Sequence, residues 1–222
     1  MSEIIFLIIT IISMITIPLA YNYLDKKGLY IMLIIMTIVS YLLSFKVLNI
    51  WGLSINANVI TTISILEIVY LLIEKETKKN HYNYLFLTIF CLIATAFAIL
   101  TTSSYIPSIN DTLSTNMKGL FIDNYQILII FPLLLIITEI ISPQIYLTLN
   151  QIYQNKIISI NLIYMVLGLL NSLIFSFIAY ASDPSFLSKL NIALATYFIG
   201  LIISILYTPI FNYLTSKKKV RL

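Results

Sequence analysis

The chain has 222 residues, of which 60% are hydrophobic and 10% are charged, and its mean hydropathy is +0.99. A soluble domain is usually about 45–50% apolar and about 25% charged, so one water-soluble core cannot bury this much apolar surface. The net charge of +4 does not indicate nucleic-acid binding, because the basic residues lie in short stretches between apolar runs, which is typical of membrane topology. The composition therefore predicts one all-α domain over residues 1–222, a polytopic integral membrane helix bundle whose main partner is the lipid bilayer.

Seven apolar runs are long enough to cross a membrane, since a helical span needs about 20 mostly apolar residues. The runs cover 4–21, 29–50, 57–74, 85–102, 125–148, 159–181 and 190–213. Unbroken runs of this length indicate helices, because the strands of a membrane barrel alternate over about 10 residues. The first run follows Met-Ser-Glu without a basic segment, so we expect a helix and not a signal peptide. The sequence thus predicts about seven transmembrane helices.

The basic residues predict the orientation of these spans. Ten of the 13 fall in the connections after the odd-numbered runs or at the C-terminus, namely Lys26, Lys27, Lys75, Lys78, Lys79, Lys156, Lys217, Lys218, Lys219 and Arg221. Lysine and arginine are enriched in cytoplasmic connections. We therefore expect a multi-pass protein of the plasma membrane with its N-terminus outside and its C-terminus in the cytoplasm. The long connection 103–124 is then external.

The third run carries an acidic and aromatic face. Glu67, Tyr70 and Glu74 follow each other at helical spacing, so they share one side of the helix. An ionisable side chain at the centre of a membrane helix costs roughly 2.5–3.5 kcal/mol, so Glu67 is a candidate functional residue, as is Glu139 in the fifth run. The alternative is a structural hydrogen bond between helices, worth about 0.6–2 kcal/mol. Glu74 lies beside Lys75 at the edge of its run, where water could solvate it.

The fifth run combines Glu139, Pro143 and Gln144. A proline within a helix removes one backbone hydrogen bond and frees the carbonyl one turn earlier, which here is that of Glu139. An opened helix beside a carboxylate is typical of the walls of binding cavities. Asn171 and Ser172 bring further polar groups into the sixth run. Lys46, near the outer end of the second, either snorkels to the surface or pairs with Glu67 or Glu139.

Several kinds of chemistry lack their residues. Cys91 is the only cysteine and lies in an apolar run, which indicates packing and excludes an intrachain disulfide. His81 is the only histidine and has no paired-ligand context, so no metal centre is predicted. The 5 glycines form no phosphate-binding loop, and no nucleophile motif stands out. We therefore expect neither an enzyme nor a bound cofactor.

Two stretches resemble a known family. The segment "YLLSFKVLNIWGLSINANVITTISILEIVYLLIEKETKK" is similar to the opening signature of the VUT (vitamin uptake transporter) family, with Lys46, Gly52 and Glu74 in register and Tyr70 where the family has an acidic residue. The segment "ISPQIYLTLNQI" resembles the family's Ser-Gln-xx-Asp helix, with Gln144 in register. Both stretches are collinear with the family pattern.

The resemblance extends over about residues 42–213 and leaves the first run as an additional N-terminal helix. "LLNSLIFSFIAYAS" resembles the family's Asp-Thr-xx-Phe run, with Asn171 and Ser172 in the first two places. The last run matches at Thr208 and Pro209 but has Gly200 where the family has a lysine. Charge is also absent at Leu147. The family pattern is therefore retained in order but has lost charged side chains.

The resemblance implies import of a small queuosine precursor of the 7-deazaguanine type. On this reading Glu139 accepts a hydrogen bond or carries a proton, and Gln144 and Asn171 read the edges of the heterocycle. Tyr70 stacks on it, and Lys46 supplies a counter-charge. The alternative is a non-transporting membrane subunit that scaffolds a larger complex, which the lost family charges favour. Substrate, coupling ion and assembly into a homo-oligomer stay open.

Overall fold

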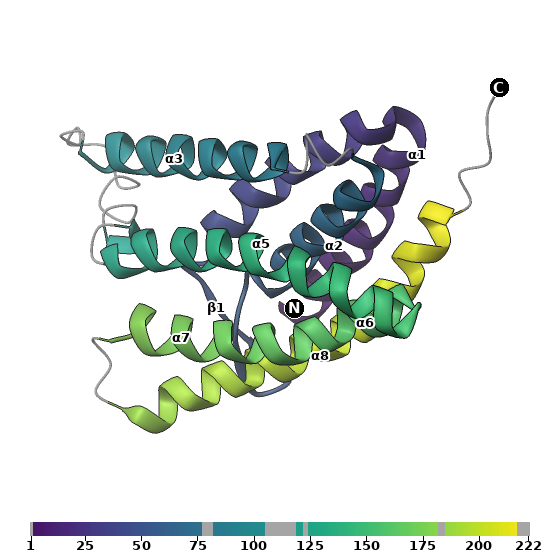
Figure 1. The fold of residues 1–222 in the computed structure, drawn as a ribbon. Helices are drawn as coiled ribbons and strands as arrows, with labels where there is room; N and C mark the ends of the chain where they lie inside the picture. The colour runs from purple at the N-terminus through teal and green to yellow at the C-terminus, as the bar shows by residue number, and fades with distance from the viewer. Residues whose placement is uncertain (1, 77–81, 105–118, 122–123, 182–184, 217–222) are drawn as a thin grey trace.

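A computed structural model describes residues 2–76, 82–104, 119–121, 124–181 and 185–216. The chain forms a bundle of long helices with one short β-hairpin (Figure 1). Its elements in order are α1 (Ser2–Leu43), β1 (Val47–Ile50), β2 (Leu53–Asn56), α2 (Val59–Lys75), α3 (Asn83–Ser104), α5 (Tyr125–Tyr153), α6 (Lys156–Ile163), the π-helical turn η2 (Tyr164–Gly168), α7 (Leu169–Ala179) and α8 (Phe186–Ser216). The long connection and His81 lie largely outside the described residues.

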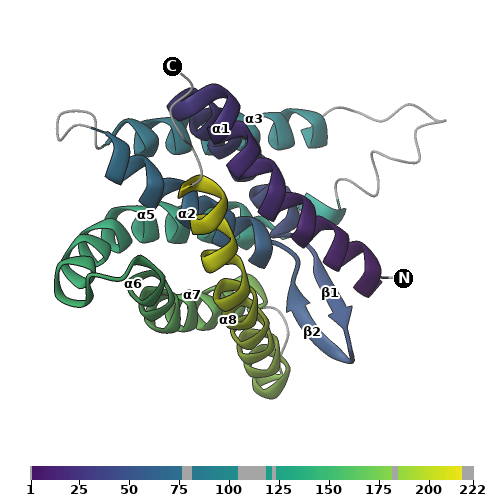
Figure 2. The same cartoon turned by 90° about the vertical axis from the view of Figure 1, so that its right-hand side faces the viewer.

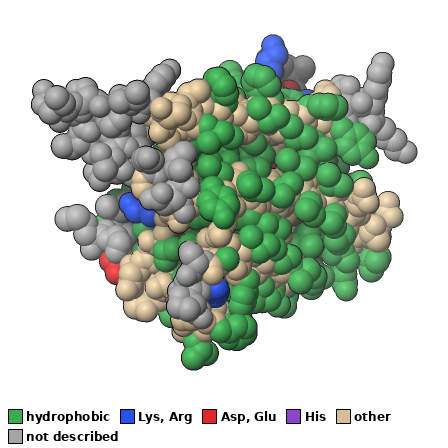
Figure 3. Space-filling model, turned by 90° about the vertical axis from the view of Figure 1, so that its left-hand side faces the viewer, with side chains coloured by type: hydrophobic (Ala, Val, Ile, Leu, Met, Phe, Trp, Pro, Cys, Tyr) green, Lys and Arg blue, Asp and Glu red, His purple; other side chains and the backbone are tan. Residues whose placement is uncertain are grey.

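Five helical stretches of the described chain are long and apolar enough to cross a membrane. They are Phe6–Leu43, Asn83–Ser104, Tyr125–Tyr153, Lys156–Ala179 and Phe186–Ser216. Large apolar side chains are exposed along them, and Figure 3 shows a broad hydrophobic area on one face of the molecule. The chain is therefore a multi-pass membrane protein, as the composition predicts. The count of seven spans stays a prediction.

The stretch Ser2–Leu43 is sharply bent. Asp25 has a non-helical backbone, with φ 56° and ψ −141°. A Cβ built on Gly28 would lie 2.1 Å from the carbonyl oxygen of Ala20, so the chain folds back on itself at this point. The two arms correspond to the predicted runs 4–21 and 29–50. Helices α1 and α2 pack against one another, and the Ser40 hydroxyl of the second arm lies 3.3 Å from the Thr62 hydroxyl of α2.

The predicted helix over 29–50 is too long, because helix α1 ends at Leu43 and a β-hairpin follows. Strands β1 and β2 pair antiparallel around a two-residue turn, in which Trp51 has φ 51° and Gly52 has φ 79°. Two consecutive positive φ angles are typical of the tight turns that match the twist of a hairpin. The hairpin crosses the bundle at a steep angle to α5 and α7 and lies beside α8 (Figures 1 and 2). The fold is thus not purely helical.

Helix α5 contains two prolines, and a tyrosine from another helix compensates each of them. Pro143 frees the carbonyl of Glu139, and the hydroxyl of Tyr84 in α3 donates to that oxygen at 3.1 Å. Pro132 frees the carbonyl of Leu128, and the hydroxyl of Tyr41 in α1 donates to it at 2.7 Å. An unpaired backbone carbonyl is costly in lipid. These two hydrogen bonds therefore pair the freed carbonyls of α5 and also hold α3 and α1 against it. The carbonyl that Pro143 frees therefore has a donor on α3, while α5 stays helical through this position.

One end of the bundle gathers lysines, and we call it the basic end. The Lys26 ammonium lies 3.5 Å from a carboxylate oxygen of Glu76 and joins the bend of α1 to the end of α2. Lys156, at the start of α6, forms an ion pair with Glu74. Connections far apart in sequence therefore meet here, as expected for helices that alternate in direction. Positive connections would place this end in the cytoplasm.

Candidate functional site

A central cavity of about 80 Å³ lies between α2, α5, α7 and α8. Its walls come from the first turns of α2, residues 131–138 of α5, and the α6–α7 segment, so it lies near the middle of the spans. Its polar wall residues include Asn56, Asn58, Thr62, Thr138, Asn171, Ser172 and Thr196, and none of its lining residues is charged. Such a site favours a neutral ligand with polar edges, because a charged ligand would lose its hydration without gaining a counter-charge.

Two of the predicted site residues, Asn171 and Ser172, line this cavity. The Asn171 amide donates to Thr138 Oγ1 at 2.7 Å, which ties α7 to α5. The Ser172 hydroxyl donates to the Leu169 carbonyl at 3.0 Å within α7. Among the described residues no donor bonds to the Asn171 side-chain oxygen, so this oxygen is available to an incoming ligand donor.

The last residue of the hairpin and the N-cap of α2 are asparagines that the sequence did not single out. Asn56 is 2% exposed, and its amide nitrogen lies 3.3 Å from the Tyr180 hydroxyl. Its backbone N–H donates to Thr196 Oγ1 at 2.9 Å, which anchors the hairpin to α8. Asn58 is the N-cap of α2 but makes no side-chain capping bond. The segment "SINANV" alternates polar and apolar residues, and this pattern could have indicated a strand leading into the site.

A π-helical turn at Tyr164–Gly168 forms another wall. Such turns inside α-helices occur frequently at functional sites. Gly200 on α8 makes room for it, because a Cβ there would lie 1.8 Å from the Tyr164 hydroxyl oxygen. A larger residue at this position could not occupy the same space. The small residue thus belongs to the packing of Tyr164 against α8.

The predicted face Glu67–Tyr70–Glu74 is assembled on the other side of α2. Glu67 is 2% exposed, and the Thr208 hydroxyl of α8 donates to its carboxylate. Tyr70 stacks on Tyr146 of α5, with ring centroids 4.8 Å apart. These three α2 residues point between α5 and α8 rather than to lipid.

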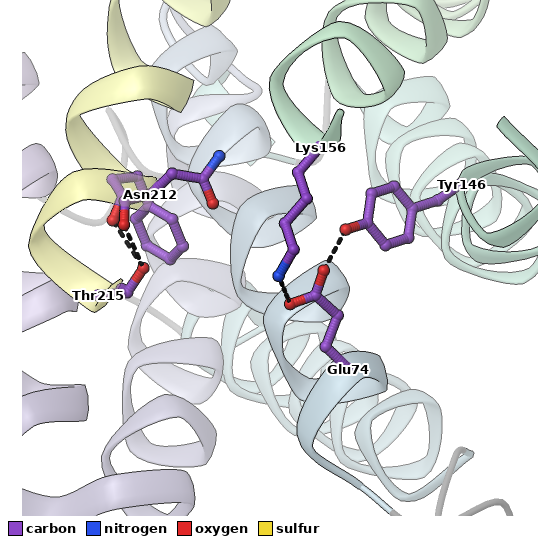
Figure 4. A network of polar contacts seen from close by, with 6 residues as sticks. Glu74, Tyr146, Lys156, Asn212 and Thr215 are labelled. Atoms are coloured by element: carbon purple, nitrogen blue, oxygen red, sulfur yellow. Dashed lines mark hydrogen bonds and ion pairs between the residues drawn. The ribbon is translucent and has the colours of Figure 1, made fainter. Parts of the chain in front are cut away.

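Glu74 is the member of this α2 face that lies nearest the basic end (Figure 4). The Tyr146 hydroxyl donates to one of its carboxylate oxygens, and the Lys156 ammonium bonds to the other. Glu74 and Lys156 also line a cleft of about 570 Å³, which we call the basic-end cleft. Glu74 is therefore held by two partners and is not simply solvated.

A cluster of aliphatic and tyrosine side chains lies between the central cavity and the basic-end cleft. Tyr70 and Tyr146 pack in one buried cluster with Leu66, Ile160 and Ile163. Leu66 and Ile163 line the central cavity, whereas Tyr146 reaches Glu74 in the cleft. The cluster therefore contacts both spaces and keeps them apart.

Glu139 is buried, with 0% exposure, but it lies between α5 and α3 and does not line the central cavity. The Thr88 hydroxyl donates to Glu139 Oε1 at 3.1 Å, while Oε2 has no hydrogen-bond partner among the described residues. The neighbouring Thr138 faces the cavity instead. Thr138 and Glu139 are adjacent in sequence, but only Thr138 belongs to the cavity wall.

Gln144 and Lys46 lie outside the assembled site. The Gln144 side chain is exposed on α5, and Tyr146 is the residue of that segment that points inward. Lys46 is exposed in the turn between α1 and the hairpin, and its backbone carbonyl accepts from Ala57 N–H at 2.9 Å. Within the described ranges neither Glu67 nor Glu139 forms an ion pair, so the predicted pairing with Lys46 is not made.

The described part of the chain brings together no group of three or more His, Cys, Asp or Glu side chains that could hold a metal ion. Cys91 is buried in α3, in keeping with a packing role. Comparison of the chain with family models, curated proteins and solved structures found no match.

Proposed function

We propose that this membrane protein transports a small, neutral, polar solute through the central cavity. The observation that carries the proposal is an uncharged, mostly apolar cavity with several polar side chains in its wall, near the middle of membrane-spanning helices and bounded by a π-helical turn and the start of α2. Interrupted helices at the bilayer midplane are the usual substrate sites of secondary transporters. The resemblance to the VUT family suggests a 7-deazaguanine-type queuosine precursor or a related heterocycle.

The size of the cavity bears on how transport would work. About 80 Å³ holds a few water molecules, and it is smaller than the about 150 Å³ that admits benzene in an engineered protein. A bicyclic heterocycle would enter only after the surrounding helices separate. The Tyr70–Tyr146 pair is then the barrier toward the basic-end cleft, and its opening would release the solute on that side. In an alternating-access mechanism, a barrier between the central cavity and the basic-end cleft would open only after the solute is bound.

Asn171 and Gln144 provide a matched test, because the resemblance gives a role to both but only Asn171 lines the cavity. Asn171→Ala would leave ligand donors unpaired and so weaken binding by about 1–3 kcal/mol, or roughly 5- to 150-fold in uptake. Gln144→Ala should leave uptake unchanged.

The assay is uptake of labelled 7-deazaguanines by cells that cannot make them, read as modified tRNA. Surface amounts of each variant must be equal. Normal uptake by Asn171→Ala would rule out the central cavity as the route. Absence of uptake by the wild-type protein, together with stoichiometric co-purifying partners, would favour the scaffold function instead.

A further inference from the structure

Glu67 lies in an unusual electrostatic environment. The side chain is buried between α2 and α8, and the Thr208 hydroxyl donates a hydrogen bond to its carboxylate. No lysine or arginine of the described chain forms an ion pair with it. An ionised carboxylate here would lose its hydration without gaining a counter-charge, so the neutral, protonated form is favoured.

A column of polar side chains leads from Glu67 to the basic-end cleft. Tyr70 lies one turn further along α2 and stacks on Tyr146, whose hydroxyl donates to Glu74 (Figure 4). Glu74 lines the cleft, where water has access. Each of these residues can bind and release a proton or exchange a hydrogen bond. The column therefore extends from a buried carboxyl group to the cleft, with ring stacking between Tyr70 and Tyr146 and a hydrogen bond between Tyr146 and Glu74.

Two groups along this column have unused hydrogen-bonding capacity. The Tyr70 and Ser142 hydroxyls are buried and interact with one another between α2 and α5, but neither makes a hydrogen bond of good geometry to a described residue. A buried hydroxyl without a partner is unfavourable, so an arrangement in which it bonds to Glu67 or to a water molecule is accessible to the protein. Tyr70 can thus connect the two ends of the column.

We propose that Glu67 is a reversible proton-binding site that exchanges with the basic-end cleft through Tyr70, Tyr146 and Glu74. On binding, a proton from cleft water joins the carboxylate oxygen, and on release it returns to that water. The titratable groups that face Glu67 are Tyr70 and Glu74 from α2, Tyr146 from α5 and Tyr207 from α8. The adjoining part of α1 presents the Ser13 carbonyl, which accepts from Tyr207. This site is independent of the proposed transport.

Glu139 is a built-in control for this proposal. It is equally buried and also accepts a bond from a threonine, Thr88. However, neither Glu139 nor Thr88 lines the basic-end cleft, and Glu139 faces α3 instead of the column. Two similar carboxyl groups thus differ mainly in their access to solvent.

Infrared spectroscopy of the purified protein in lipid vesicles tests the proposal without any transported solute. The C=O stretching bands of protonated carboxyl groups are recorded in water and followed after transfer to D₂O. Thr208→Val should shift only the Glu67 band, and Thr88→Val should shift only the Glu139 band. Glu67→Gln, which keeps the size of the side chain, should delete the first band and assigns it independently.

We expect the Glu67 band to shift in D₂O before the Glu139 band, and Tyr146→Phe to slow the shift of the Glu67 band alone. We also expect the Glu67 band to disappear reversibly as the pH is raised. The proposal is overturned if no protonated band responds to Thr208→Val or Glu67→Gln. Equal exchange rates of the two carboxyl groups, or exchange at Glu67 that Tyr146→Phe leaves unchanged, would overturn the route through the column.

Discussion

Tyr84→Phe removes the hydroxyl that satisfies the carbonyl freed by Pro143, and its effect can be worked from the structure. The Glu139 carbonyl accepts from Tyr84 at 3.1 Å, and Pro143 cannot supply the backbone N–H that would otherwise bond to it. Hydrogen bonds between membrane helices average about 0.6 kcal/mol and reach about 1.7 kcal/mol. We therefore expect a loss of about 1 kcal/mol in the free energy of unfolding, or ~2–4 °C in Tm for a chain of this size.

The decisive measurement is a double-mutant cycle with Pro143→Ala, read by thermal unfolding of the purified protein in detergent. An alanine at 143 restores the N–H, so the Glu139 carbonyl regains its helical hydrogen bond. Tyr84→Phe should then cost close to nothing in the Pro143→Ala background. A full cost of Tyr84→Phe in both backgrounds would refute the reasoning that the tyrosine compensates the proline.

Helix α5 supplies its own control for this cycle. Tyr41 and Pro132 are related through the Leu128 carbonyl in the same way, so their cycle should show coupling of the same sign. The two carbonyls lie about 16 Å apart along the helix. Tyr84→Phe and Pro132→Ala should therefore be additive, because sites this distant rarely share partners.

Three other substitutions should affect stability for different reasons, each measured by the same unfolding assay. Gly52→Ala should cost about 1–2 kcal/mol through its left-handed backbone alone, since no atom lies within 4 Å of the added Cβ; Gly52→Asn should recover part of this loss. Gly200→Ala should cost about 1–3 kcal/mol through overlap with Tyr164, and wild-type stability would contradict that packing. Lys156→Met should cost at most about 1 kcal/mol, because the ammonium that pairs with Glu74 is half exposed; a larger loss would show that the pair is a principal tie at this end.

Much of the architecture follows from local patterns in the sequence. Long apolar runs specify membrane helices because a bilayer leaves no partner for an unpaired backbone group. The spacing of Glu67, Tyr70 and Glu74 predicted a shared face, and the structure confirms that all three point into one column. The proline rule correctly identified the carbonyl of Glu139 as the one that needs a donor.

Other predictions were wrong because hydrophobicity does not distinguish an apolar strand from the end of a helix. Residues 47–50 are apolar enough to extend the predicted second helix, yet they pair with β2. The Trp51–Gly52 turn determines this outcome through backbone conformation, which a hydropathy pattern does not register. The asparagines of the hairpin were missed for the same reason.

The sequence by itself determined that this chain is a membrane protein and roughly which residues form its helices. It also determined which polar side chains need partners within the membrane. Only the tertiary structure decided which partner each one has. Rotation of a helix by one residue moves a side chain by about 100°, so Thr138 lines the central cavity while Glu139 faces α3. Helical spacing predicts neighbours on one helix, but the packing between helices decides what they face.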